Sequence, residues 1–173
     1  TQKEARDARR ALISEWRGDV QHVLFAHTQD DQAETVLMRL ARGSGVEGLS
    51  GMAAQVDTPQ GWQILRPLLG TTRAELRHYI TVLRVPYVDD PSNNDPRYQR
   101  VRTRRALVEL DALGISQDRL ASTATAMQAA QQALAARMRD VAALCVETEF
   151  GHLQIDRDAF ARIEPDTQHR LMA

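Results

Sequence analysis

The sequence predicts an α/β fold in which a partial parallel sheet is flanked by helices and followed by a helical appendage. The run His22–Ala26 has no polar alternation, which is typical of a strand covered on both faces in a parallel sheet, and an amphipathic helical pattern follows it directly. From Ser116 the composition shifts to Ala, Gln and Met, with apolar residues spaced by seven, which predicts one long helix.

The first element is expected to be a helix over Gln2–Trp16, where apolar side chains recur at three- or four-residue steps on one face. These side chains are Ala5, Ala8, Leu12 and Trp16. Gly18 ends this helix, and the strand His22–Ala26 comes next.

The helix after the strand is expected to begin with a D-x-x-E capping box of Asp31 and Glu34, and to close at Gly43. The run Gly43–Gly48 matches GxGxxG, but it follows a helix rather than a strand, so it lacks the context of a dinucleotide-binding loop. We expect these glycines to turn the chain back through Gly51 with positive φ angles.

An extended stretch is expected over Trp62–Leu65, and a second helix from Thr72, with Glu75 completing its capping box. Val85-Pro86 stops this helix. Its predicted buried stripe consists of Leu76, Tyr79, Ile80 and Leu83.

The segment Asp89–Pro96 is dense in turn-forming residues and is predicted to be a loop. The long helix then runs from Ser116 to about Glu149. Beyond it we expect an extended piece over His152–Ile155 and a helix that starts near Asp156 or Asp158. A domain junction over residues 113–116 would divide the chain into a core of residues 1–115 and an appendage of residues 116–173.

The composition bounds the class of protein. With 173 residues and 43% hydrophobic content, the chain can form one folded domain and a smaller appendage. Of the 22 basic residues only Lys3 is a lysine, and arginine pairs phosphate bidentately where lysine acts as a point charge. The lone cysteine, Cys145, excludes an internal disulfide and any CxxC pair and suits a reducing compartment. No apolar run approaches the roughly 20 residues of a membrane span.

Three residues at the strand-to-helix junction are candidates for nucleotide chemistry: His27, Asp30 and Asp31. Ligands of open α/β sheets bind beyond the carboxyl ends of strands, where helix N-termini offer free N–H groups to phosphate, and acids near a triphosphate commonly share a magnesium ion with it. The alternatives stay open. The histidine can simply bond a loop carbonyl, and the acids can simply cap the helix.

A second candidate is Arg97–Arg105, with five arginines in nine residues and a tyrosine among them. An anionic partner, either ATP or RNA phosphate, would relieve their mutual repulsion. A solvated helix face backed by Glu109 and Asp111 explains them equally well. The chain has no zinc-ligand spacing, basic zipper or GxSxG elbow, which argues against the matching DNA-binding and hydrolase classes.

Four motifs in order, HTQDDQAETVLMRLARGSGVEGLSGM, ILRPLL, PYVDDPSN and the arginine run at Arg100–Arg104, resemble the tRNA(Ile)-lysidine synthetase family over Arg6–Ile115. The resemblance implies a PP-loop ATP pyrophosphatase that adenylates the C2 carbonyl of the wobble cytidine of an isoleucine tRNA. Lysine then displaces AMP. It also implies ATP and Mg²⁺ as cofactors, isoleucine tRNA and lysine as partners, a cytoplasmic location without a membrane, and allows a homodimer.

The resemblance also implies roles for individual residues. The implied catalytic residues are His27, Asp31, Arg102 and Arg104. The implied ATP-binding residues are His27, Asp30, Asp31, Gly43 and Gly45. The implied phosphate- or substrate-binding residues are Arg9, Arg66, Arg100, Arg102 and Arg104.

The chain departs from the family pattern at one important place, because the Ser-Gly-Gly-x-Asp-Ser loop that cradles pyrophosphate does not occur in it. We therefore expect a fragment that lacks the first strand and this loop, and that is inactive alone. Two other functions remain open. One is a PP-loop tRNA thiolase, against which the lone cysteine argues, and the other is a non-catalytic fragment that binds RNA or a subunit.

Overall fold

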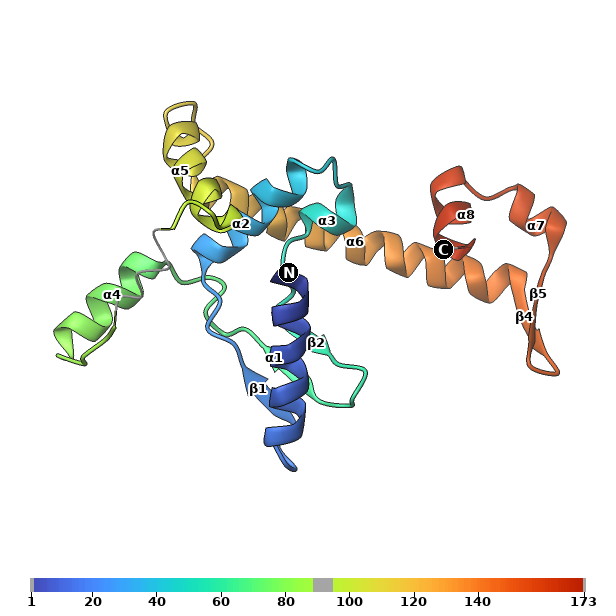
Figure 1. Cartoon of the computed structure of the whole chain (residues 1–173). Helices are drawn as coiled ribbons and strands as arrows, with labels where there is room; N and C mark the ends of the chain where they lie inside the picture. Colours follow the sequence, from blue (N-terminus) through green and yellow to red (C-terminus); the bar gives the residue numbers. More distant parts are fainter. Residues whose placement is uncertain (1, 89–94, 173) are drawn as a thin grey trace.

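The computed structural model describes residues 2–88 and 95–172, so most of the predicted loop Asp89–Pro96 lies outside the described residues (Figure 1). The elements in chain order are α1 (Gln2–Trp16), β1 (His22–Leu24), α2 (Gln29–Leu40), α3 (Val46–Leu49), β2 (Gln55–Asp57), β3 (Gln63–Leu65), α4 (Arg73–Val82), α5 (Gln99–Asp111), α6 (Gln117–Cys145), β4 (Val146–Glu149), β5 (His152–Ile155), α7 (Arg157–Ala161) and α8 (Pro165–Met172).

A small sheet of order β1-β3-β2 lies beside these helices. β1 pairs with β3 in parallel, with Val23 opposite Ile64, and the short β2 pairs with β3 antiparallel. The predicted α/β class, with a partly parallel sheet flanked by helices, is confirmed. The sequence pattern did not indicate β2, because three residues in a turn-rich stretch show no periodicity.

The core lies where α2, α5 and α6 meet. Ala33 and Val36 of α2 pack with Leu107 of α5 and with Leu120 and Ala124 of α6. α6 therefore packs against α2, and also against α3, before it runs on toward the C-terminal elements (Figure 1).

Three predicted apolar faces are less covered than expected. β1 is not buried on both faces, since Leu24 is 67% exposed. α1 has its predicted bounds, but Trp16 is 89% exposed. α4 has no fully buried residue, and Tyr79 of its predicted stripe is 61% exposed. Periodicity indicates which side of an element is apolar, and it does not say what covers that side.

The cap of α2 corrects one prediction. The N-cap is Thr28, whose hydroxyl accepts the Asp31 N–H, while the Asp31 carboxylate accepts the Thr28 N–H, so the capping box is Thr28–Asp31 rather than Asp31–Glu34. The helix begins three residues earlier than predicted, which frees Glu34 for another role. The capping box of Thr72 and Glu75 at α4 is confirmed.

After α2 the chain turns through Gly43, at φ 71°, and Gly51, at φ 67°, as predicted, whereas Gly45, at φ −80°, and Gly48 inside α3 do not have the predicted positive φ. Between them lies the short helix α3, and Gln32 holds the backbone that follows. The Gln32 Oε1 accepts the Met52 N–H at 2.7 Å, and its Nε2 donates to the Met52 carbonyl at 2.9 Å.

The long helix α6 has Ser116 as its N-cap and ends at Cys145, a little earlier than predicted. It ends there because Val146–Glu149 form β4, which pairs antiparallel with β5. Asp156 caps α7, as predicted. None of the helices within the described residues combines the length and apolar character that crossing a membrane requires.

Candidate functional site

A cavity of about 640 Å³ opens at the carboxyl ends of the two parallel strands. Phe25 and His27 follow β1, and Arg66 follows β3 directly. The described residues that line it are Arg9, Arg10, Phe25, His27, Thr35, Arg39, Glu47, Ser50, Gly51, Met52, Ala53, Val56, Arg66, Arg100, Gln128 and Gln131. The described lining thus contains five arginines and one acidic residue, so its net charge is positive and the cavity suits an anion.

His27 lies on the wall of this cavity, three residues beyond β1, as the strand-to-helix reading predicted. Its ring lies against the ring of Phe25, with 5.8 Å between centroids. An imidazole at this place can hydrogen-bond a ligand in the cavity.

Two of the lining arginines also hold the backbone of the wall. Arg66 is only 8% exposed and donates from Nη1 to the Ala53 carbonyl at 2.6 Å. Arg39 donates from Nη1 to the carbonyls of Gly48 and Gly51, each at 2.8 Å. These bonds fix both guanidinium groups before any ligand arrives, which lowers the cost of ordering them on binding.

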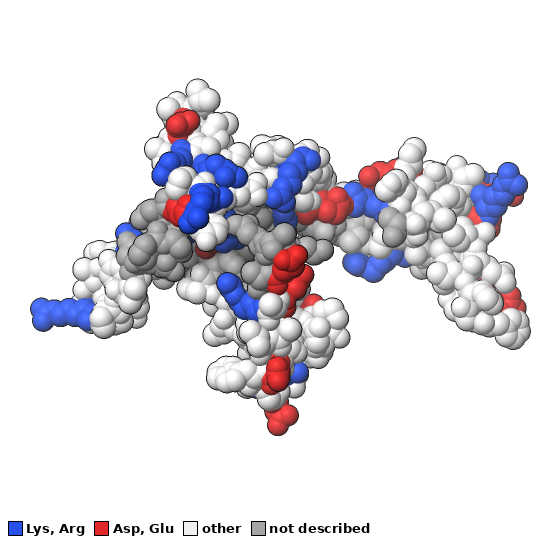
Figure 2. Space-filling view, in the orientation of Figure 1, with Lys and Arg blue, Asp and Glu red and all other residues white. Residues whose placement is uncertain are grey.

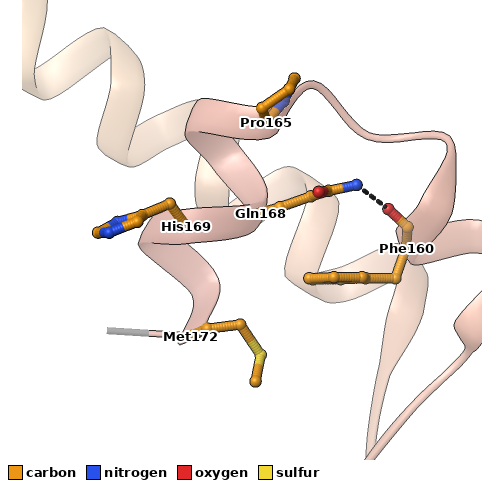
Figure 3. Close-up of a pocket in the computed structure, with 5 residues that line it drawn as sticks. All are labelled: Phe160, Pro165, Gln168, His169 and Met172. Atoms are coloured by element: carbon orange, nitrogen blue, oxygen red, sulfur yellow. Dashed lines mark hydrogen bonds between the residues drawn. The ribbon is translucent and has the colours of Figure 1, made fainter.

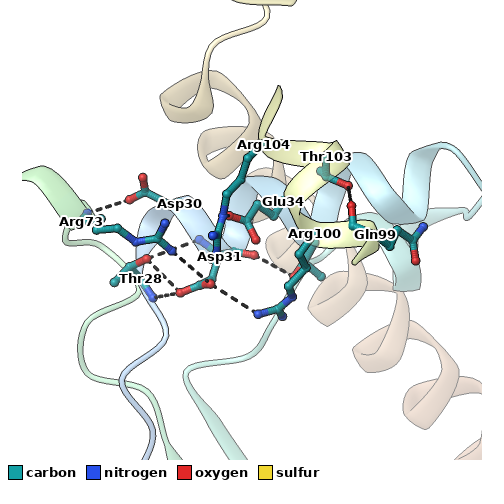
Figure 4. Close-up of polar contacts among 10 residues, drawn as sticks. Thr28, Asp30, Asp31, Glu34, Arg73, Gln99, Arg100, Thr103 and Arg104 are labelled. Atoms are coloured by element: carbon teal, nitrogen blue, oxygen red, sulfur yellow. Dashed lines mark hydrogen bonds and ion pairs between the residues drawn. The ribbon is translucent and has the colours of Figure 1, made fainter. Parts of the chain in front are cut away.

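Asp31 does not line the cavity, but it contacts Arg100, which does (Figure 4). Its Oδ2 accepts hydrogen bonds from the N–H and hydroxyl of Thr28, each at 2.9 Å. Its Oδ1 lies 3.5 Å from Nη1 of Arg100 and 3.8 Å from Nη2 of Arg73. Arg100 thus links the buried Asp31 to the cavity wall.

Asp30 points to a different element. Its Oδ2 accepts the backbone N–H of Arg73, the first residue of α4, at 2.7 Å. A carboxylate at a helix N-terminus stabilises that end, so Asp30 caps α4 from α2. The two neighbouring acids therefore fasten α4 and α5 to the start of α2.

Glu34 belongs to the same network and was not among the predicted site residues. Its side chain is 1% exposed, and it accepts a hydrogen bond at 2.5 Å from Nε of Arg104 on α5. Burial raises the pKa of Glu34, and the bond to Arg104 opposes that rise. The sequence did offer a signal for this role, because Glu34 lies three and four residues after Asp31 and Asp30, on the same helix face. We missed it because Glu34 was assigned to the capping box.

The predicted site residues fall into two groups. Those that line the cavity are Arg9, His27, Arg66 and Arg100. Those that lie outside the lining are Asp30, Asp31, Gly43, Gly45, Arg102 and Arg104. The exposed Arg102 donates to the carbonyls of Pro96 and Arg97, and Figure 2 shows basic side chains gathered over α5 on this face.

The described acids do not fit a dedicated magnesium site. No group of three or more His, Cys, Asp or Glu that could hold a metal occurs in residues 2–88 and 95–172. Both oxygens of Asp31 already contact donors, and two guanidinium groups beside it oppose a divalent cation. We assign no protein ligand to the magnesium expected with ATP.

Other hollows in the described structure have different chemistry. A cavity of about 410 Å³ between α7 and α8 contains no arginine or lysine among its lining residues (Figure 3). These residues are Phe160, Pro165, Gln168, His169 and Met172. A cavity of about 630 Å³ beside α4 has acids and no base in its described lining, so it does not suit phosphate either.

A protein-family model matches the part of the chain that contains the predicted site residues. Residues 1–110 match the family model described as PP-loop domain, and this match covers more than half of the chain. The match includes every predicted site residue from Arg9 to Arg104.

The chain is also similar to curated tRNA(Ile)-lysidine synthases. The protein of Ruegeria pomeroyi is 46% identical over 135 residues, 77% of this chain and 32% of that protein. Those of Anaplasma marginale and Wolbachia pipientis wMel are 36% and 37% identical over 99% of this chain and 37% and 40% of their own lengths. This chain thus spans about a third of the length of these relatives. The resemblance read from the four motifs is confirmed, and the chain belongs to the PP-loop domain family.

Proposed function

We propose that this chain contributes the nucleotide pocket of an ATP-dependent tRNA-modifying ligase, which adenylates the wobble cytidine of an isoleucine tRNA and joins lysine to it. The observation that carries the proposal is the arginine-lined cavity at the carboxyl ends of β1 and β3. Its place in the sheet is where α/β proteins bind nucleotides, and its charge suits a triphosphate. The relatives carry the name tRNA(Ile)-lysidine synthase, which supports an isoleucine tRNA as the substrate, and the chemical steps follow from the family resemblance of the four motifs.

In the proposed reaction the C2 carbonyl oxygen of the cytidine attacks the α-phosphorus of ATP, and pyrophosphate leaves. An amine of lysine then attacks C2, loses a proton, and AMP leaves. Negative charge develops on the pyrophosphate in the first step. Arg66 and Arg100 lie on the cavity wall, where fixed cations would stabilise that charge.

The proposed roles of the predicted residues follow from where they lie. His27 and Arg9, on the wall, contact ATP or its phosphates. Asp31 acts through Arg100, whose guanidinium it holds. Arg102, exposed on α5, contacts RNA phosphate, and Arg104 anchors α5 through Glu34.

The remaining expectations stay proposals. Binding of ATP by Asp30, Gly43 and Gly45, a magnesium ion carried in with ATP, a cytoplasmic location and a homodimer are predicted from the sequence. The division at residues 115 and 116 is likewise a prediction. The thiolase alternative is disfavoured because Cys145 is 3% exposed at the far end of α6 and does not line the cavity.

The test uses the protein as its gene encodes it, with ATP affinity measured by calorimetry and lysine incorporation into isoleucine tRNA measured with labelled lysine. Arg100→Gln removes a lining cation and should weaken ATP binding at least tenfold, about 1.4 kcal/mol. The control is Arg105→Gln, which makes the same change on an exposed residue of the same helix. Equal ATP affinities for the two variants, or no lysine incorporation by the unmodified protein, would contradict the proposal.

A further inference from the structure

We infer that the long helix α6 completes the nucleotide pocket, and that Gln128 is a positioning residue that holds the turn Ser50–Met52 as one wall of that pocket. This inference rests on the proposed function. Gln128 lies outside the 1–110 region that the PP-loop family model matches, and no motif of the sequence marked it.

The contact itself is specific. The Gln128 side-chain amide donates from Nε2 to the Ser50 carbonyl at 2.8 Å and to the Met52 carbonyl at 3.1 Å. Gln128, Ser50 and Met52 all line the same cavity. One amide from α6 therefore joins two carbonyls of a segment 76 to 78 residues earlier in the chain.

The turn is also held from α2, where Arg39 donates to the Gly51 carbonyl and Gln32 bonds Met52, and Gln128 adds a contact from α6. Gly51 lies between the two bonded residues at φ 67°, a conformation that glycine adopts without strain. A Cβ atom there would lie 2.6 Å from Gln32 Oε1, so the wall at Gly51 is bare backbone. Gln32 from α2 and Gln128 from α6 both donate to the Met52 carbonyl.

The hydrogen bonds of Gln128 affect how the pocket wall would meet a phosphate. Carbonyl oxygens carry partial negative charge and would repel a phosphate in the cavity. The Gln128 amide gives the Ser50 and Met52 oxygens a hydrogen bond each and holds them in place, while the arginines set the charge that the phosphate meets. The contribution of Gln128 is thus to pocket geometry, and it need not touch ATP.

The packing of α6 makes the placement firm. Leu120 and Ala124, on the turns before Gln128, are buried in the core with α2. Since a helix is rigid over a few turns, this packing fixes where the amide of Gln128 can reach. The N-terminal half of α6 therefore forms part of the pocket wall.

The test compares Gln128→Met and Gln128→Glu in the protein as its gene encodes it. Methionine keeps the size and helix preference of glutamine but lacks the N–H donor, and glutamate replaces the donor with a charge that repels the two carbonyls. The matched control is Gln132→Met, which makes the same change at an exposed residue one turn further along α6.

We expect Gln128→Met to raise the KM for ATP about tenfold and Gln128→Glu to raise it more, while kcat changes less than twofold. Hydrogen exchange should accelerate at residues 50–52 and not along α6. The Tm of Gln128→Met should stay within about 2 °C of that of Gln132→Met, a shift of less than about 1 kcal/mol in a domain of this size.

Equal KM values for Gln128→Met and Gln132→Met would overturn the inference while leaving the proposed function intact. A fall in kcat that matches the fall in Tm, with KM unchanged, would also overturn it, because a purely structural role predicts that pattern. If the unmodified protein itself did not bind ATP, the proposed function would fail first, and this inference with it.

Discussion

At the scale of single residues, the acids of α2 act mainly as anchors for arginines. Asp31 holds Arg100, and Glu34 holds Arg104, so that two arginines of α5 are fixed by carboxylates that are nearly buried. A buried carboxylate without a cation lowers the stability of the fold. Removing the arginine of either pair should therefore destabilise the protein.

The first prediction concerns Glu34 and Arg104. Arg104→Met leaves the buried carboxylate without its cation and should lower the free energy of unfolding by about 2–3 kcal/mol, less than a fully buried pair because Arg104 is 27% exposed. Adding Glu34→Gln should recover most of that loss. Urea denaturation at pH 7 measures both, with Arg105→Met as the exposed control. If Arg104→Met had the same free energy of unfolding as the unmodified protein, the pair would contribute nothing to stability.

The residue scale also shows what the sequence could not reveal. His27 was found because a histidine after an apolar run is visible as a pattern. Glu34 was missed as a paired group because glutamate is normally exposed, and nothing local shows that Arg104, 70 residues later, covers it. Asp31 was predicted to be the N-cap, but it is the N3 residue of a capping box whose N-cap is Thr28; the error arose because Thr28 and Asp31 can each serve as an N-cap.

At the scale of elements, the glycines between α2 and β2 are unequal. Gly43 and Gly51 both have positive φ, but a Cβ at Gly43 would meet nothing within 4 Å, whereas one at Gly51 would meet Gln32. Gln32 cannot move aside without breaking its two bonds to Met52.

Gly43→Ala should therefore cost only the strain of the left-handed conformation, about 1 kcal/mol. Gly51→Ala should cost about 2–3 kcal/mol, because the loss of the two Gln32 hydrogen bonds is added to that strain. Thermal unfolding of the two variants measures the difference. If Gly43→Ala proved the more damaging substitution, the role assigned to Gln32 would be wrong.

Helices and strands were predicted well where residues within one turn determine them. They were predicted poorly where packing against other elements determines them. The capping box at Thr72 and the cap at Asp156 depend on residues within one turn, and both were found. β2 exists only because β3 lies beside it, and α6 lines the pocket only because Leu120 and Ala124 pack on α2. Neither relation has a signature in a stretch of sequence read alone.

At the scale of the whole molecule, charged pairs fasten the C-terminal elements to the rest. Arg137 of α6 donates to Glu164 at 2.9 and 3.1 Å, just before α8. Arg170 of α8 pairs with Glu47 of α3, a residue that also lines the pocket. These exposed contacts join α8 to both α6 and the pocket wall.

The pair at Glu164 makes the docking of α8 sensitive to acid. Hydrogen bonds, first from Arg137 and then from the backbone and Thr167, lower the pKa of Glu164 to about 2 from an ordinary value of 4.5. A carboxyl with a lowered folded-state pKa stabilises the fold fully above 4.5, and this stabilisation is lost as the pH falls toward 2.

We therefore expect the Tm difference between the unmodified protein and Glu164→Gln to be largest at pH 5–7, to shrink as the pH falls, and to be gone near pH 2. Added salt should reduce it at every pH because the pair is exposed. Glu147→Gln, an exposed change on β4, provides the control. A Tm difference that stayed constant from pH 6 to pH 2 would contradict this assignment.

The most direct test of the central claim is a crystal structure of the protein as its gene encodes it, with a non-hydrolysable ATP analogue. The account predicts triphosphate density in the cavity between His27, Arg66 and Arg100, with Gln128 still bonded to the Ser50 and Met52 carbonyls. Nucleotide bound in the acidic cavity beside α4, or anywhere else outside the arginine-lined cavity, would contradict it.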